Sequence, residues 1–177
     1  ASVVAGKPLS YNNLMDAAAA LELVQDLKTA TNKPSAAVIK HTNPCGAAVA
    51  DSITASFTAA WQCDTLAAFG GIVALSEPVE INLAHEISHG EKFFEVIVAP
   101  SFSKESIEEL SSRWKNIRLL AVGKEQRNHT WQQVRSVEGG LLVQDMTEAQ
   151  ADPTCWEHVA GPSPTSRQLK DAVLAWI

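Results

Sequence analysis

Short apolar runs alternate with amphipathic segments along the first two thirds of this sequence. Runs rich in Val, Ile, Leu and Ala are predicted as buried strands at 35–40, 72–75, 94–99 and 117–122. The segments between them are predicted as helices at 51–63, 80–89 and 103–113. Strands alternating with helices form a parallel sheet with right-handed crossovers and helices on both faces. The predicted fold class is therefore α/β, a three-layer sandwich with a mainly parallel sheet covered by helices.

Further elements flank this alternation. A helix is predicted at 13–28, with its buried face formed by Leu14, Ala17, Ala18, Leu21 and Val24. A polar loop is predicted at 41–46, and two more strands at 134–137 and 141–144. Thr165 and Gln168 form a capping-box pattern that opens a last helix over 165–177. Because nothing in the sequence caps that helix at its end, we expect the chain to be a piece of a longer polypeptide.

Charge and cysteine content exclude several classes of function. The chain of 177 residues carries 14 Lys and Arg against 20 Asp and Glu, a net charge of −6, with no basic cluster that would bind nucleic acid. No apolar run reaches the roughly 20 residues that cross a bilayer. The three cysteines form no C-x-x-C pair, which argues against a disulfide framework and a thiolate zinc site and favours a cytoplasmic location.

A histidine motif offers a metal-dependent alternative. The segment 85–89 reads H-E-I-S-H and matches the H-E-x-x-H pattern of zinc hydrolases, with Glu105 or Glu109 as a conceivable third ligand. Gly90 follows His89 directly and should end the helix there. We therefore expect no metal site, and we expect His85 and His89 to lie at an exposed polar helix end.

A second candidate site follows the first predicted strand, where Lys40 and His41 stand side by side. A lysine ammonium disfavours the imidazolium form of a neighbouring histidine, which leaves a neutral base, while the ammonium can stabilise developing negative charge. This pair suits acyl-type transfer, although two solvated residues at a strand end would look the same. Cys45 is a weaker candidate nucleophile, because a thiolate needs a stabilising partner and a base.

A third candidate is Phe69-Gly70-Gly71, where glycines permit close approach of a ligand to the backbone. The sequence holds neither G-x-G-x-x-G nor a P-loop, so nucleotide binding of those kinds has no support.

The order of these motifs resembles the AICAR formyltransferase portion of the bifunctional purine biosynthesis family, which combines that activity with IMP cyclohydrolase. The motifs are GKPLSYNNLMDA (6–17), KHTNPCG (40–46), AFGGIVAL (68–75), FEVIVAP (94–100) and RSVEGGLLVQ (135–144). The resemblance implies formyl transfer from 10-formyltetrahydrofolate, a co-substrate, to the 5-amino group of AICAR, without a metal. It also implies a fold like that of cytidine deaminase, although the zinc-binding motif of that enzyme is missing.

The resemblance assigns roles to particular residues. His41 would assist deprotonation of the amine and Lys40 would stabilise the transition state. Asn13, Phe69, Gly70 and Glu95 would contact the nucleotide, and Glu95 departs from the Asp found in relatives.

The resemblance also implies that residues 1–177 form only the first α/β subdomain of the formyltransferase region. A second subdomain with the folate pocket and a cyclohydrolase domain would lie elsewhere in a homodimeric enzyme. The expected partners are AICAR, folate and the rest of the polypeptide, with neither nucleic acid nor membrane. The alternatives are a zinc hydrolase acting through His85 and His89, and a non-catalytic binding module.

Overall fold

The computed structural model describes residues 1–124, 132–146 and 151–177. The chain divides into two compact units, Ala1–Lys124 and Glu125–Ile177, which are described separately.

The first unit is built on one six-stranded sheet. Its strands, in spatial order, are β1 (Ser2–Ala5), β6 (Arg118–Ala121), β5 (Phe94–Ala99), β4 (Gly71–Leu75), β2 (Ser35–Lys40) and β3 (Asn43–Val49). β4, β5 and β6 run parallel, whereas β2 is antiparallel to both β3 and β4, and β1 is antiparallel to β6. The sheet is therefore mixed, with β3, β4, β5 and β6 pointing in one direction.

The direction of β2 corrects the sequence prediction, which placed 35–40 parallel to the other strands and 41–46 in a loop. His41 and Thr42 form a two-residue turn, and their positive φ angles of 53° and 61° are typical of a type I′ hairpin turn. The chain therefore reverses directly from β2 into β3. The helix α2 (Ile53–Cys63) then leads from β3 to β4, on the other side of β2, so β2 lies antiparallel between them.

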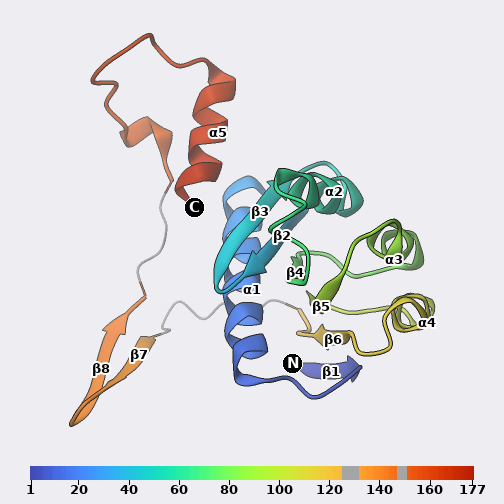
Figure 1. Cartoon of the computed structure of the whole chain (residues 1–177). Coiled ribbons are helices and arrows are strands. Elements are labelled where there is room, and N and C mark those ends of the chain that lie inside the picture. The colour runs from blue at the N-terminus through green and yellow to red at the C-terminus, as the bar shows by residue number, and fades with distance from the viewer. Residues whose placement is uncertain (125–131, 147–150) are drawn as a thin grey trace. The chain divides into compact units, whose positions relative to one another are not determined.

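Helices cover both faces of this sheet, as predicted (Figure 1). α1 (Tyr11–Thr31) lies on one face, over a core that includes Ile39, Ile72 and Val98. α2, α3 (Ile81–Ser88) and α4 (Lys104–Arg113) lie on the other face, over a core that includes Val38, Val73 and Ile97. Because alternate strand residues face opposite sides, each buried strand supplies both cores.

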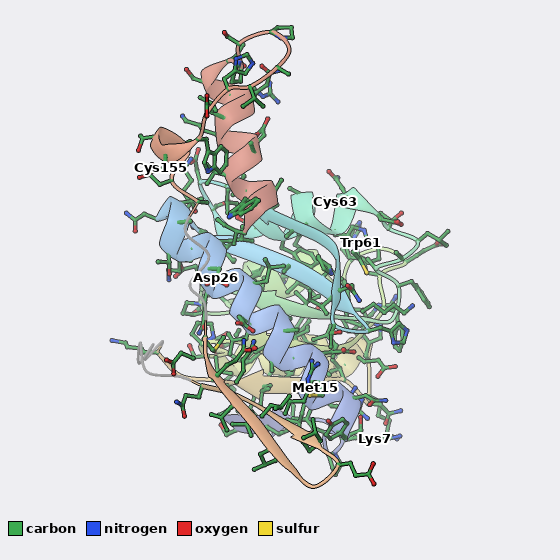
Figure 2. All side chains as sticks on the ribbon, turned by 90° about the vertical axis from the view of Figure 1, so that its left-hand side faces the viewer. Lys7, Met15, Asp26, Trp61, Cys63 and Cys155 are labelled. Atoms are coloured by element: carbon green, nitrogen blue, oxygen red, sulfur yellow. The ribbon has the colours of Figure 1, made fainter. Side chains whose placement is uncertain are left out.

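The buried face of α1 agrees with the prediction at Ala17 and Val24 and differs from it at Leu14 and Ala18. Leu14 is 52% exposed and Ala18 is also exposed. The residues that face the sheet are Asn13, Ala17, Ala20, Val24 and Leu27. Figure 2 looks onto the outer side of this helix, where Met15 lies. The small side chains of Ala17 and Ala20 let the helix approach the sheet closely, so this face, rather than the larger Leu14, packs inward.

α1 ends three residues later than predicted, and the remaining predicted elements of the first unit agree with the structure to within two residues at each end. β1 was not predicted. It has four residues and, among the described strands, pairs only with β6; it lies beside Gly6, whose φ of 90° and close approach to Ile117 exclude a side chain. Such a short edge strand depends on its tertiary pairing, which a local sequence pattern does not report.

The second unit contains a hairpin and a helix. β7 (Gln132–Val137) and β8 (Gly140–Asp145) pair antiparallel, which confirms the two predicted strands. A short 3₁₀ turn, η1 (Pro153–Cys155), precedes α5 (Ser166–Trp176), and the predicted capping box between Thr165 and Gln168 is present. Within the described parts of the chain, no helix is both long enough and apolar enough to span a membrane.

Candidate functional site

The candidate residues of the first unit gather where the strands β2, β4 and β5 end or begin, on the same side of the sheet. Lys40 ends β2, and Gly71 and Phe94 begin β4 and β5. Because β2 is antiparallel to β4, the carboxyl end of β2 meets the amino ends of β4 and β5. The site thus differs from the pattern of an all-parallel sheet, whose ligands bind beyond the carboxyl ends of the strands.

Lys40 is anchored to the glycine-containing loop. Its half-buried side chain donates a hydrogen bond from Nζ to the backbone oxygen of Phe69 at 2.9 Å. Gly70 has a φ of +76°, and its N–H donates to the backbone oxygen of Phe93 at 2.8 Å. Two of the predicted motifs, separated by 29 residues, are therefore joined at the site. An ammonium has three donors, so Lys40 retains others for a ligand.

His41 stands in a strained turn. It and Thr42 both occupy the left-handed backbone region without being glycine. A non-glycine residue held in this backbone conformation costs about 1–3 kcal/mol of folding free energy, and a β-branched residue such as threonine is especially disfavoured there. The Thr42 N–H donates to Asp16 Oδ1 at 2.8 Å, and the Asn43 side-chain amide donates to the His41 backbone oxygen at 2.9 Å. The exposed His41 side chain is thus presented by a turn that other residues hold in place.

Asn13 and Glu95 form a second link across the site. Asn13 is 7% exposed, and its Oδ1 accepts from the Ser10 N–H at 3.2 Å, which completes a capping box of α1. Its Nδ2 donates to Glu95 Oε2 at 3.2 Å. Two predicted nucleotide-binding residues therefore contact each other, with Asn13 on α1 and the exposed Glu95 on β5.

Sequence reasoning missed Asp16 as a site residue. The sequence pattern that could have identified Asp16 is its spacing from Asn13, since residues three apart share a face of a helix. On α1 that face otherwise consists of buried Ala, Val and Leu. A polar pair at the start of an otherwise apolar helix face marks the part of that face that makes the polar contacts of the site.

Cys45 lies close to this site but in a structural position. It is the extra residue of a β-bulge, because Val38 pairs with Gly46 whereas Ile39 pairs with Pro44. The half-buried side chain packs against the core. Burial raises the pKa of the Cys45 thiol, and the nearby Lys40 only partly offsets that effect. A raised thiol pKa reduces the thiolate at neutral pH, which argues against a nucleophile.

The H-E-x-x-H segment behaves as a helix end. α3 ends at Ser88, and His89 has extended backbone angles, so the predicted stop before Gly90 is confirmed. His85 Nδ1 lies 3.3 Å from Glu109 Oε1, and the Ser88 hydroxyl lies 2.7 Å from the same oxygen. The hydrogen bond from Ser88 is the main cause that holds the pKa of Glu109 below its usual value. Among the residues that the structure describes, no three His, Cys, Asp or Glu side chains cluster as metal ligands.

A depression of about 470 Å³ opens beside the glycine-containing loop. Its lining residues are Trp61, Thr65, Leu66, Phe69, His89, Gly90, Glu91 and Lys92. Phe69 is the one predicted nucleotide-binding residue among them. The depression therefore adjoins the site without containing Lys40 or His41.

The chain is thus an α/β protein in which an anchored lysine, an adjacent histidine and a buried asparagine lie where β2 ends and β4 and β5 begin. The family model described as AICARFT/IMPCHase bienzyme matches residues 1–177, and the chain belongs to this family of bifunctional enzymes.

Curated relatives agree with this assignment. The chain is 40% identical over 171 residues to the bifunctional purine biosynthesis protein PurH of Thermoanaerobacter sp. (strain X514). It is 37% identical to PurH of Oceanobacillus iheyensis and 39% identical to PurH of Bacillus cereus (strain AH187). Each match covers 97% of this chain and 32% of the relative. The chain therefore spans about a third of the length of these relatives.

Proposed function

We propose that this chain supplies the acid–base part of a formyltransferase site, which transfers a formyl group from 10-formyltetrahydrofolate to the 5-amino group of AICAR. The observation that carries this proposal is that Lys40 is anchored on Phe69, while the start of α1 contacts both the turn that carries His41 and Glu95. The family membership supports the choice of substrates.

The proposed chemistry forms one bond and breaks another. The amine nitrogen of AICAR attacks the formyl carbon, and the bond between that carbon and N10 of the folate breaks. His41 accepts the proton that the amine loses and passes it to N10 as the folate leaves. Lys40 stabilises the negative charge that develops on the formyl oxygen, because a preorganised ammonium stabilises such charge most where water is excluded.

The proposed nucleotide site consists of Asn13, Phe69, Gly70 and Glu95. Phe69 is 53% exposed, and its ring offers an apolar surface to the flat base. The carboxylate of Glu95 accepts hydrogen bonds and repels phosphate, so we assign it to the hydroxyl or amino groups of the nucleotide. The Asn13 amide retains one N–H beyond the one it donates to Glu95.

We further propose that the chain is the first α/β subdomain of the formyltransferase region, with a cytidine-deaminase-like fold. The chain spans 32% of its relatives, which leaves room for a folate-binding subdomain and a cyclohydrolase domain in a homodimeric cytoplasmic enzyme. The proposed reaction uses no metal, because the acid–base pair and the formyl folate account for every bond and proton.

The test is a formyltransfer assay with AICAR and 10-formyltetrahydrofolate, on the 177-residue chain and on a version extended to the length of its relatives. We expect turnover by the extended protein alone, because aligning two substrates contributes about 7–11 kcal/mol to the barrier reduction. Robust turnover by the short chain would refute the subdomain proposal. Inactivity of both proteins would refute the formyltransferase proposal and favour a non-catalytic module.

A further inference from the structure

The first turns of α1 hold two separate parts of the site. Asn13 contacts Glu95 on β5, and Asp16, three residues later on the same helix face, contacts the turn between β2 and β3. Asp16 is half-buried, and its Oδ1 accepts the Thr42 N–H at 2.8 Å. This is a contact across 26 residues between a carboxylate and the backbone of the turn that carries His41.

The turn lacks the residues that would form it unaided. Type I′ turns favour Asn-Gly, because both central residues need positive φ, whereas here the two positions hold His41 and Thr42. The strand that follows adds limited support, since β3 is an edge strand with a bulge and contains Pro44, which has no N–H. The local sequence therefore disfavours the observed turn, and a tertiary contact has to stabilise it.

We propose that Asp16 is a positioning residue, whose carboxylate clamps the His41–Thr42 turn in its left-handed conformation and so fixes the direction in which the His41 side chain leaves the backbone. This inference rests on the role proposed for His41. Lys40 is anchored independently, on the Phe69 backbone oxygen. Without the clamp, the turn would relax to another type, and His41 would move relative to a lysine that stays in place.

The first arm of the test measures amide hydrogen exchange at Thr42 by NMR in the 177-residue chain. We expect Asp16→Ala to accelerate exchange about 10-fold or more, since a hydrogen bond to a charged group is lost. Asp16→Asn keeps an acceptor and should restore most of the protection. Glu108→Ala is the matched control, because it removes an exposed carboxylate from α4, away from the site. Unchanged Thr42 exchange in Asp16→Ala would overturn the clamp.

The second arm uses glycine to replace the clamp. In the double variant Asp16→Ala/Thr42→Gly, glycine adopts positive φ without strain, so the turn should form without the carboxylate. In the extended protein we expect Asp16→Ala to lower kcat about 10- to 100-fold with little change in KM, as a small misplacement of a catalytic group does. The double variant and Asp16→Asn should recover most of that loss.

The two arms separate the clamp from the proposed function. Inactivity of the unmodified extended protein would refute formyl transfer, whereas the exchange measurement would still decide the clamp. If Asp16→Asn lowered kcat as much as Asp16→Ala, and glycine gave no rescue, Asp16 would act through its charge rather than through the turn. That result would overturn the positioning role.

Discussion

Asn13 and Glu95 are 82 residues apart in sequence and share a hydrogen bond of 3.2 Å between Nδ2 and Oε2. The same Asn13 side chain caps α1 through its Oδ1. A residue proposed to bind nucleotide therefore also holds the start of a helix against a strand, so its stability and binding effects have to be measured separately.

Asn13→Ala should destabilise the chain by about 1–2 kcal/mol, because it removes both the cap interaction and the bond to Glu95. Glu95→Gln keeps an acceptor oxygen and should change stability by less than about 0.5 kcal/mol. Urea unfolding of the 177-residue chain measures both effects. Asn12→Ala, at an exposed neighbouring position, is the control, and an equal loss in Asn12→Ala would contradict the role given to Asn13.

Lys40→Ala and His41→Ala should lower kcat of the extended protein by about 10²–10⁴-fold while KM for AICAR changes little. The reason is that both groups are proposed to act on the transition state rather than on the bound nucleotide. Steady-state kinetics with both substrates varied would measure the two parameters. A raised KM with near-normal kcat would show that the pair binds substrate instead.

Acid should destabilise the chain partly through Glu109, whose pKa is lowered mainly by the hydrogen bond from Ser88. A carboxyl with a lowered folded-state pKa contributes stability above its unfolded pKa, and that contribution is lost as the pH falls through the folded pKa. Ser88→Ala should therefore lower the free energy of unfolding at neutral pH, and that free energy should then fall less between neutral and acid pH than it does in the unmodified chain. Urea midpoints across that range measure this, with the exposed Ser112→Ala as control. Parallel pH curves for Ser88→Ala and the unmodified chain would refute it.

Cys45 should be alkylated by iodoacetamide with a pH midpoint above that of an ordinary thiol, because burial raises its pKa. Lys40→Ala should move the midpoint higher still, since the ammonium partly counteracts burial. Mass spectrometry of the alkylated peptides would follow the reaction, with Lys33→Ala as a control that removes a distant charge paired with Asp51. A midpoint that falls in Lys40→Ala would show that the assigned cause is wrong.

Purified chain should retain no stoichiometric zinc after dialysis. His89 lies beyond the end of α3 in an extended conformation, and His85 contacts Glu109. The two imidazoles are therefore not held one helical turn apart on one helix face, as a pair of zinc ligands would be. Elemental analysis of the unmodified chain and of His85→Ala decides this. Zinc bound at one equivalent and lost in His85→Ala would revive the hydrolase alternative.

The sequence alone determined the layers of this protein. Apolar runs such as 94–99 and amphipathic segments such as 103–113 carry their periodicity locally, so strands, helices and the two covered faces were predictable. The capping box of Thr165 and Gln168 is likewise a local pattern. The motif order also indicated the family, because it records residue types at fixed places along the chain.

Tertiary structure alone decided strand direction and the contacts of the site. β2 runs antiparallel because His41 and Thr42 adopt left-handed angles that their own side chains disfavour, and the contact that holds them comes from Asp16 on another element. The same applies to Asn13 with Glu95 and to Lys40 with Phe69. Contacts between residues far apart in the chain leave no local periodicity, so only the folded chain reveals them.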